Sequence, residues 1–194
     1  MTAPSVASQV AALKKDNPDT WMIFATPGPT IRAYITATKL GFKPSTIITN
    51  SVSATDLYLT IAKKGGSDLT DGTITDAYAK DPASPLWKKD PGMRTYYRLM
   101  GRFAPKANLI DGNNLYGFAK AYTFVDTLYK AGKNPTRESL MAAAQTLNEK
   151  NPFLLPGVVV KTSKTDHFAV SQITLTKYTN NTFVNFGGLF NGRH

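Results

Sequence analysis

Hydrophobic and polar residues follow two different periods along the first part of the chain. Uninterrupted apolar runs such as WMIFAT are typical of strands buried on both faces of a parallel sheet. Between these runs, apolar residues recur with the spacing of one helix face. The pattern predicts helices over 5–15, 30–40 and 54–64, and strands over 21–26, 46–49 and 71–78. Repeated strand–helix units of this kind predict an α/β fold with a parallel sheet and flanking helices.

The pattern changes after Tyr78. Residues 79–92 are rich in proline and charge and predict a crossover to a second, mainly helical part. Helices are predicted there over 93–103, 112–131 and 136–147. On the second of these helices, an apolar stripe is expected to face a core rather than a ligand; it consists of Leu115, Phe118, Tyr122, Val125 and Leu128.

The last part of the chain alternates with period two. Val158 and Val160 predict a short strand, and two alternating segments around Thr179-Asn180-Asn181 predict a β-hairpin. The expected division of the chain is 1–78, with the strand–helix units; 79–160, mainly helical; and 161–194, with the C-terminal β-hairpin.

The formal net charge of +10, from 23 basic and 13 acidic residues, makes nucleic-acid binding worth testing. The basic residues are dispersed, and no basic arm or nucleic-acid motif accompanies them, so we expect no nucleic-acid partner. Four basic residues do follow one another at i+4 spacing, and a solvated helix face is favoured over an anion-binding one; they are Arg94, Arg98, Arg102 and Lys106.

Candidate chemistry is sparse. The chain has no cysteine and only two histidines, His167 and His194, which excludes a thiolate or His-rich metal site. No phosphate-binding glycine loop, nucleophile elbow or zinc-protease motif is present. We therefore predict neither an enzyme nor a protein that holds a metal or a cofactor.

The chain shows no targeting signal in its first residues. They lack a basic region followed by an apolar one, so no signal peptide is predicted in this chain. No apolar run approaches the ~20 residues that a membrane-spanning helix needs.

Polar groups gather where two predicted strands end. Thr26 follows the first of these strands, and Asn50, Ser51 and Ser53 follow the second. In parallel sheets, ligands bind beyond the carboxyl ends of the strands, next to the N-termini of the following helices. These side chains are candidate ligand-binding groups, and Ser51 or Ser53 is also expected to cap the helix that follows.

Several segments, taken in order, resemble one protein family. They are DNPDTWMIFATPGPTIRAYITATKLGFKPSTIITNSVSA, AYAKDPASPLWKKDPGMRTYYRLMGRFAP, DGNNLYGFAKAYTFVDTLYKAG, TRESLMAAA and LLPGVVVKTSKTDHFAVSQITLTKY. Together they resemble the type I periplasmic solute-binding proteins of branched-chain amino-acid-type ABC transporters. The resemblance covers nearly the whole chain, although no single segment is diagnostic.

The resemblance implies two lobes around a hinged cleft in proteins about twice this long. Residues 1–75 correspond to most of the second lobe and residues 80–160 to the later part of the first, with the final hairpin returning toward the second lobe. This chain therefore corresponds to the C-terminal half or so, and its solute affinity alone is expected to be weak.

The resemblance also places individual residues. In amino-acid-binding members, a glutamate that holds the ligand's ammonium group stands where this chain has Asn50, and an aromatic residue often stands where it has Thr26. A neutral amide cannot supply the negative charge, so we expect a carboxylate-bearing ligand, either branched-chain amino-acid-like or an aromatic acid. Tyr78 is a candidate for stacking on its apolar body.

The implied partners are a small-molecule ligand and, for the full-length protein, an ABC permease, with a periplasmic or extracytoplasmic location. A sensory ligand-binding domain of a receptor with the same fold is the alternative function. An uncovered lobe surface is a candidate for self-association, because large exposed apolar faces are unfavourable in water.

Overall fold

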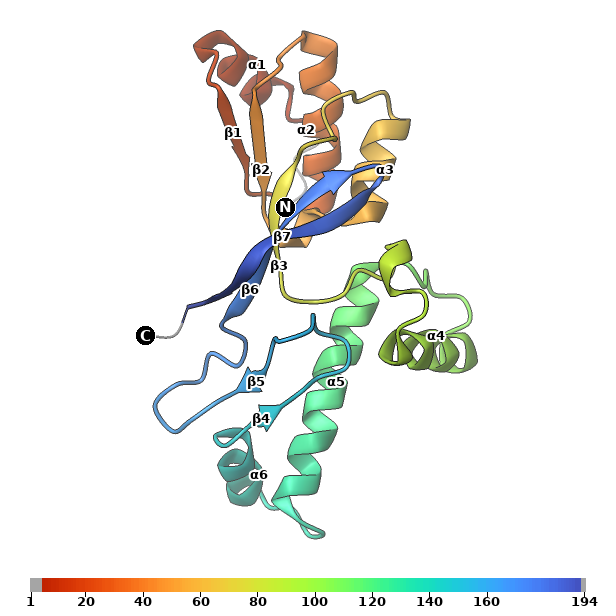
Figure 1. Cartoon of the computed structure of the whole chain (residues 1–194), viewed down its shortest axis with the longest axis vertical. Helices are drawn as coiled ribbons and strands as arrows, with labels where there is room; N and C mark the ends of the chain where they lie inside the picture. Colours follow the sequence, from red (N-terminus) through yellow and green to blue (C-terminus); the bar gives the residue numbers. More distant parts are fainter. Residues whose placement is uncertain (1–4, 193–194) are drawn as a thin grey trace. The chain divides into compact units, whose positions relative to one another are not determined.

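A computed structural model describes residues 5–192 of the chain. These residues belong to two compact units, each with its own packed elements (Figure 1). The first unit comprises residues up to 77 together with 174–188, and the second comprises residues 78–173 and those from 189 on.

The first unit is built around a mixed five-stranded sheet with the order β1-β2-β3-β6-β7. Strands β1, β2 and β3 are parallel, and β6 runs antiparallel to β3, so the C-terminal hairpin extends the predicted parallel sheet. The elements are α1 (Ala7–Asp16), β1 (Thr20–Ile23), α2 (Pro27–Leu40), β2 (Thr46–Thr49), η1 (Ser51–Ser53), α3 (Asp56–Lys64), β3 (Ile74–Ala77), β6 (Gln172–Thr179) and β7 (Thr182–Asn191).

Local signals set the boundaries of these helices. Helix α2 begins three residues earlier than its periodicity predicts, because Pro27 fits the first helical position, where no N–H hydrogen bond is lost. It ends at Gly41, whose φ of 68° is the left-handed conformation that glycine adopts freely. Helix α3 is capped by Thr55, whose hydroxyl accepts a hydrogen bond from the Tyr58 N–H at 3.2 Å.

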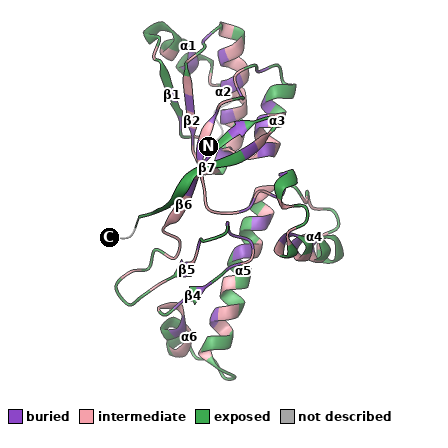
Figure 2. Ribbon diagram, viewed as in Figure 1, coloured by how far each residue is buried: buried purple, intermediate pink, exposed green. Residues whose placement is uncertain are grey.

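One face of the sheet carries the core of the first unit. Trp21, Ile23 and Ile47 from the strands are buried there, against Tyr34 of α2 and Leu59 of α3 (Figure 2). Helix α1 contributes to the same cluster and contacts α2, which in turn contacts α3. The three helices therefore cover a single face of the parallel strands.

The opposite face of the parallel strands is open to solvent in this unit. Met22 is 57% exposed, and Phe24, just beyond β1, is 73% exposed. The expectation that these strands are covered on both faces is therefore wrong for the described part of the chain. The apolar run alone could not reveal this, because it records that both faces are apolar and not which of them the chain covers.

The C-terminal hairpin is joined to α3 by one buried carboxylate. Asp56 Oδ1 accepts a hydrogen bond from the Phe183 N–H at 2.7 Å, and Oδ2 accepts one from the Thr182 hydroxyl at 2.5 Å. The turn between β6 and β7 has Asn180 and Asn181 at φ 52° and 65°, as a two-residue hairpin turn requires. The predicted hairpin and its turn are confirmed.

The second unit is organised around the long helix α5. Its elements are η2 (Pro85–Trp87), α4 (Pro91–Phe103), α5 (Gly112–Ala131), α6 (Arg137–Ala144), β4 (Asn148–Glu149) and β5 (Val160–Lys161). Edge-to-face aromatic contacts connect α4 and α5 to the loop after β4, with ring centroids 5.4 Å apart for Tyr96–Phe118 and 5.6 Å apart for Phe118–Phe153. Helix α6 is capped by Thr136, in a capping box with Ser139.

The apolar stripe predicted on α5 is only partly buried. Leu115 is 1% exposed, whereas Tyr122 and Val125 are 43% and 48% exposed. These two residues and Phe153 line an open apolar groove of about 510 Å³ beside α4. The prediction that the whole stripe faces a core is therefore wrong within residues 5–192.

We predict that Asp56→Ala lowers the free energy of unfolding by about 3 kcal/mol, because it leaves the buried Phe183 N–H without its acceptor. Urea denaturation at pH 7 measures the change. The control is Asp68→Ala, which removes the exposed ion pair with Lys43 at 2.9 Å and should change stability little. Equal losses in the two variants would contradict the assigned role of Asp56.

Candidate functional site

The carboxyl ends of β1 and β2 are held side by side by hydrogen bonds to the main chain of β1 and its following residues. The Asn50 N–H donates to the Ile23 carbonyl at 3.2 Å, and the Thr49 hydroxyl donates to the same carbonyl at 3.1 Å. The Ser53 hydroxyl donates to the Ala25 carbonyl. The loops after the two strands therefore lie next to each other, as expected at the carboxyl ends of neighbouring parallel strands.

Thr26 stands at the start of α2. It is the N-cap residue, in an extended conformation, and its carbonyl accepts the first helical bond from the Thr30 N–H at 3.1 Å. Its side chain makes no capping hydrogen bond, and the residue is exposed. Pro27 and Pro29 have no N–H and the Thr30 N–H is already bonded, so the Gly28 N–H is the donor of the first turn that lies with the Thr26 hydroxyl at this end of the sheet.

Asn50 occupies the corresponding position after β2. It precedes η1 without capping it through its side chain, and its Oδ1 atom is buried with no hydrogen-bond partner among the described residues. Because a buried acceptor without a donor costs free energy, such an atom is a candidate for contact with a ligand. This is the strongest polar signal at the strand ends.

Ser51 and Ser53 differ in burial and in hydrogen bonding. Ser51 is half-buried at the start of η1, and its carbonyl accepts from the Ala54 N–H at 3.4 Å. Ser53 is fully buried, and its hydroxyl donates to the Ala25 carbonyl, which ties the two loops together. The prediction that one of them caps α3 is wrong, because the chain makes a separate 3₁₀ turn there and Thr55 becomes the cap.

Tyr78 belongs to the second unit, whereas Thr26, Asn50, Ser51 and Ser53 belong to the first. The main chain of Tyr78 is fixed within its own unit, because its carbonyl accepts a hydrogen bond from the Leu155 N–H at 2.9 Å. Its stacking role remains a prediction.

Arg32 joins the candidate site, although no sequence pattern indicated it. Its guanidinium nitrogens lie 3.5 and 4.0 Å from the point that a Cβ atom on Gly28 would occupy, so the side chain folds back over the first turn of α2. Helical side chains lean toward the N-terminus, which allows this reach. The start of α2 thus combines the Gly28 N–H with a positive charge.

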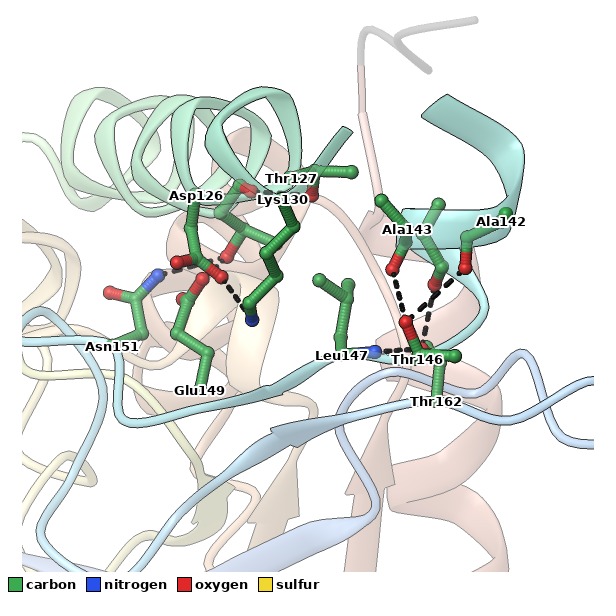
Figure 3. Close-up of polar contacts among 12 residues, drawn as sticks. Asp126, Thr127, Lys130, Ala142, Ala143, Thr146, Leu147, Glu149, Asn151 and Thr162 are labelled. Atoms are coloured by element: carbon green, nitrogen blue, oxygen red, sulfur yellow. Dashed lines mark hydrogen bonds and ion pairs between the residues drawn. The ribbon is translucent and has the colours of Figure 1, made fainter. Parts of the chain in front are cut away.

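A second polar cluster lies between α5 and the β4 region of the second unit (Figure 3). Glu149 Oε1 accepts a hydrogen bond from the Thr123 hydroxyl at 2.8 Å, and the Asn151 amide donates to the Ala119 carbonyl at 2.9 Å. Nearby on α5, Lys130 pairs with Asp126 at 2.6 Å. These bonds anchor the chain after α6 to α5.

The surroundings of the Glu149 carboxyl raise its pKa. Burial raises its pKa, the neighbouring Asp126 adds to the rise, and the hydrogen bond from Thr123 opposes it. The hydrogen bonds of Glu149 and Asn151 to α5 give the cluster a structural role.

No group of three or more His, Asp or Glu side chains in residues 5–192 is placed to hold a metal ion. Within the same residues, no helix is both long and apolar enough to cross a membrane.

Comparison with known proteins identifies the family to which the chain belongs. The model of the periplasmic binding protein family matches residues 1–182, so the chain belongs to this family. A search of curated protein sequences gave no match.

Solved structures agree with the family assignment. A branched-chain amino acid ABC transporter protein from Thermus thermophilus with bound valine matches with a TM-score of 0.77 and 15% identity, over 98% of this chain and 52% of that chain. A fatty acid ABC transporter substrate-binding protein from Thermomonospora curvata matches with a TM-score of 0.73 and 23% identity, over 98% and 48%. A leucine-binding protein from Thermotoga maritima matches with a TM-score of 0.65 and 14% identity, over 97% and 49%.

These matches confirm the predicted α/β fold of the periplasmic-binding-protein type. The chain spans about half the length of the solved structures that it matches.

We predict that Glu149→Gln alters the pH dependence of stability. A carboxyl whose pKa is raised in the folded state stabilises the fold below its ordinary pKa, near 4.5, and loses this contribution as the pH rises through the folded-state value. The stability of the variant relative to the original protein should therefore increase from pH 4 toward neutral pH, as measured by urea denaturation across that range.

The control for this prediction is Glu138→Gln. Hydrogen bonds at the start of α6, the main-chain one first, lower the pKa of Glu138, so its contribution is present above its ordinary pKa and lost as the pH falls. The two substitutions should change the pH profile in opposite directions, and a shared direction would contradict the assignment for Glu149.

Proposed function

We propose that this chain contributes to the solute-binding component of an ABC importer and takes part in holding a small carboxylate-bearing molecule. Family membership supports solute binding rather than catalysis. The permease of the importer would be the protein partner, and the site of action periplasmic or extracytoplasmic. Since the chain spans about half the length of its structural relatives, we expect the affinity of these residues alone to be weak.

The observation that carries the proposal is the buried Oδ1 atom of Asn50, which has no partner in the described structure. The side-chain amide offers both an acceptor and a donor. Asn50 follows β2 as Thr26 follows β1, and the Asn50 N–H joins the two strand ends through the Ile23 carbonyl. We expect the Thr26 hydroxyl and the Gly28 N–H, which has no helical acceptor, to reach the same ligand. A ligand with one carboxylate and one N–H or O–H group would satisfy both kinds of group.

The positive charge near the start of α2 favours a carboxylate ligand there. Helix N-termini favour anions, and the Arg32 guanidinium lies over the first turn of α2. No acidic side chain stands at position 50, so a ligand ammonium group would lack the charge that would balance it there. The named ligands of the relatives, valine, leucine and fatty acid, all carry a carboxylate, and fatty acids carry no ammonium group.

The test is an NMR titration of the protein with 4-hydroxybenzoate, which carries one carboxylate and one O–H donor, and with leucine, because NMR detects weak binding. We expect 4-hydroxybenzoate to shift the amide signals of Thr26 and Asn50. Asn50→Ala should weaken binding by about tenfold, roughly 1.4 kcal/mol, through the loss of one amide contact. The exposed Asn148→Ala is the matched control and should bind 4-hydroxybenzoate as the original protein does.

A second variant tests the charge argument. Asn50→Glu should weaken 4-hydroxybenzoate binding by repulsion and strengthen leucine binding by pairing with its ammonium group. Tight leucine binding by the original protein without 4-hydroxybenzoate binding would refute the argument that position 50 disfavours a ligand ammonium group, and the absence of both would refute solute binding by this chain alone.

A further inference from the structure

Basic residues are concentrated in the second unit. This unit holds 15 of the 23 lysines and arginines of the chain but only 7 of the 13 acidic residues. The first unit, with the other 8 basic and 6 acidic residues, is close to neutral. The formal charge of +10 therefore belongs largely to one unit, and a field of one sign attracts partners of the opposite sign.

Six of these basic residues fall within one short segment around helix α4, and all six are exposed. They are Lys88, Lys89, Arg94, Arg98, Arg102 and Lys106. The three arginines belong to α4 and recur at i+4 spacing, so they form a row about 12 Å long on one side of the helix. We call them the arginine row. Exposed residues extend along the whole helix (Figure 2).

The other side of α4 is occupied by the core of its own unit. Met93, Tyr96 and Met100 are buried there. The Tyr96 hydroxyl donates a hydrogen bond to the Leu109 carbonyl at 2.9 Å, and the Tyr96 ring packs edge-to-face on Phe118 of α5. These contacts hold the helix in place with the arginine row outward. They also mean that the apolar side of α4 is not free to insert into a membrane.

No acidic side chain neutralises this group of basic residues. The acidic residue of the segment is Asp90, whose carboxylate pairs with the buried Lys80 at 2.8 Å and accepts a hydrogen bond from the Met93 N–H at 3.0 Å. None of the six basic residues forms an ion pair with another residue in the described part of the chain. The spacing in the sequence favoured a solvated helix face, but it could not show that the nearest carboxylate is already engaged.

An aromatic side chain lies at the C-terminal end of the arginine row. Phe103 is 72% exposed, and the guanidinium carbon of Arg102 lies 5.0 Å from the centre of its ring. Exposed aromatic rings combined with basic side chains are typical of protein surfaces at membrane interfaces, where the ring enters the headgroup region and the charges contact phosphates. The segment therefore offers both kinds of contact that an anionic membrane surface accepts.

We propose that the arginine row, the three neighbouring lysines and Phe103 bind the headgroups of anionic phospholipids at a membrane surface. A row of charges of one sign matches a surface of uniformly negative charge. The contact is peripheral, because the core holds the apolar side of α4.

An acidic protein surface fits these residues less well as a partner. Protein interfaces are depleted in lysine, and three of the six basic residues are lysines. The permease proposed above lies in a membrane, so a component of the importer would work beside one. This last point rests on the proposed function, whereas the charges and contacts of α4 do not.

The test is co-sedimentation of the 194-residue protein with vesicles of phosphatidylglycerol and phosphatidylcholine in equal parts, and with vesicles of phosphatidylcholine alone. We expect the protein to sediment with the first kind of vesicle and to stay in solution with the second. Binding should fall as the salt concentration rises from about 0.1 M to about 1 M, because the Debye length shortens from about 10 Å to about 3 Å. No solute is added, so the result does not depend on the proposed ligand.

Two triple variants separate the arginine row from net charge. The first removes the row and should weaken binding to the anionic vesicles by about a hundredfold; it carries Arg94→Gln, Arg98→Gln and Arg102→Gln. The control removes the same charge from three other exposed residues of the second unit and should weaken binding by about twofold or less; it carries Arg137→Gln, Lys150→Gln and Lys164→Gln.

A second pair of variants tests the aromatic contact. Phe103→Ala should weaken binding to the anionic vesicles by about tenfold, through the loss of the apolar area that the headgroup region covers. Phe168→Ala is the matched control, because Phe168 is 81% exposed and lies in the same unit. It should leave binding unchanged.

Three outcomes would overturn the proposal. The protein could treat the two kinds of vesicle alike, by binding both or neither. The two triple variants could lose equal affinity, which would assign the attraction to net charge and not to the arginine row. Fluorescence anisotropy at the same salt concentration could show duplex DNA bound more tightly than the anionic vesicles, with that binding lost when the arginine row is removed, which would identify a nucleic acid as the partner.

Discussion

The packing of three helices on one face of a parallel sheet is the constraint on which the rest of the first unit depends. Because α2 crosses that face to connect β1 to β2, the two strands run in the same direction and finish at the same end of the sheet. This brings the loop after β1, with Thr26, beside the loop after β2, with Asn50. The same packing leaves the opposite face, with Met22, open. The candidate binding site and the open surface thus have one physical origin.

Hydroxyl side chains make up most of the polar groups at the carboxyl ends of the strands. Thr49 and Ser53 donate to carbonyls at the end of β1, and Thr75 of β3 donates to the Thr49 carbonyl at 2.7 Å. These side chains satisfy main-chain acceptors in a buried region, where a missing partner is costly. Asn50 is different, because its buried oxygen has no such partner in the described residues. A row of similar polar residues therefore separates into structural groups and one candidate ligand contact.

Much of the fold and part of the site follow from local pattern. The helices, the strands other than β4, and the Asn180-Asn181 turn were predictable from periodicity and turn chemistry. The neighbouring positions of Thr26 and Asn50 were predictable because the carboxyl ends of parallel strands lie together. The role of Arg32 was not, because it depends on a long side chain folding back over a turn. The capping role of Thr55 was also missed, since Ser51 and Ser53 are equally good caps and only the turn η1 decides between them.

The sequence by itself determined the α/β class, the family and the polar character of the strand ends, because each depends on residue order and short-range spacing. Only the tertiary structure decided which apolar residues are buried. Met22 and Ile23 are adjacent and both apolar, yet one is exposed and the other belongs to the core. An apolar side chain favours burial, but whether it is buried depends on which face of the sheet the helices cover. Contacts between segments that are distant in the sequence decide which face that is.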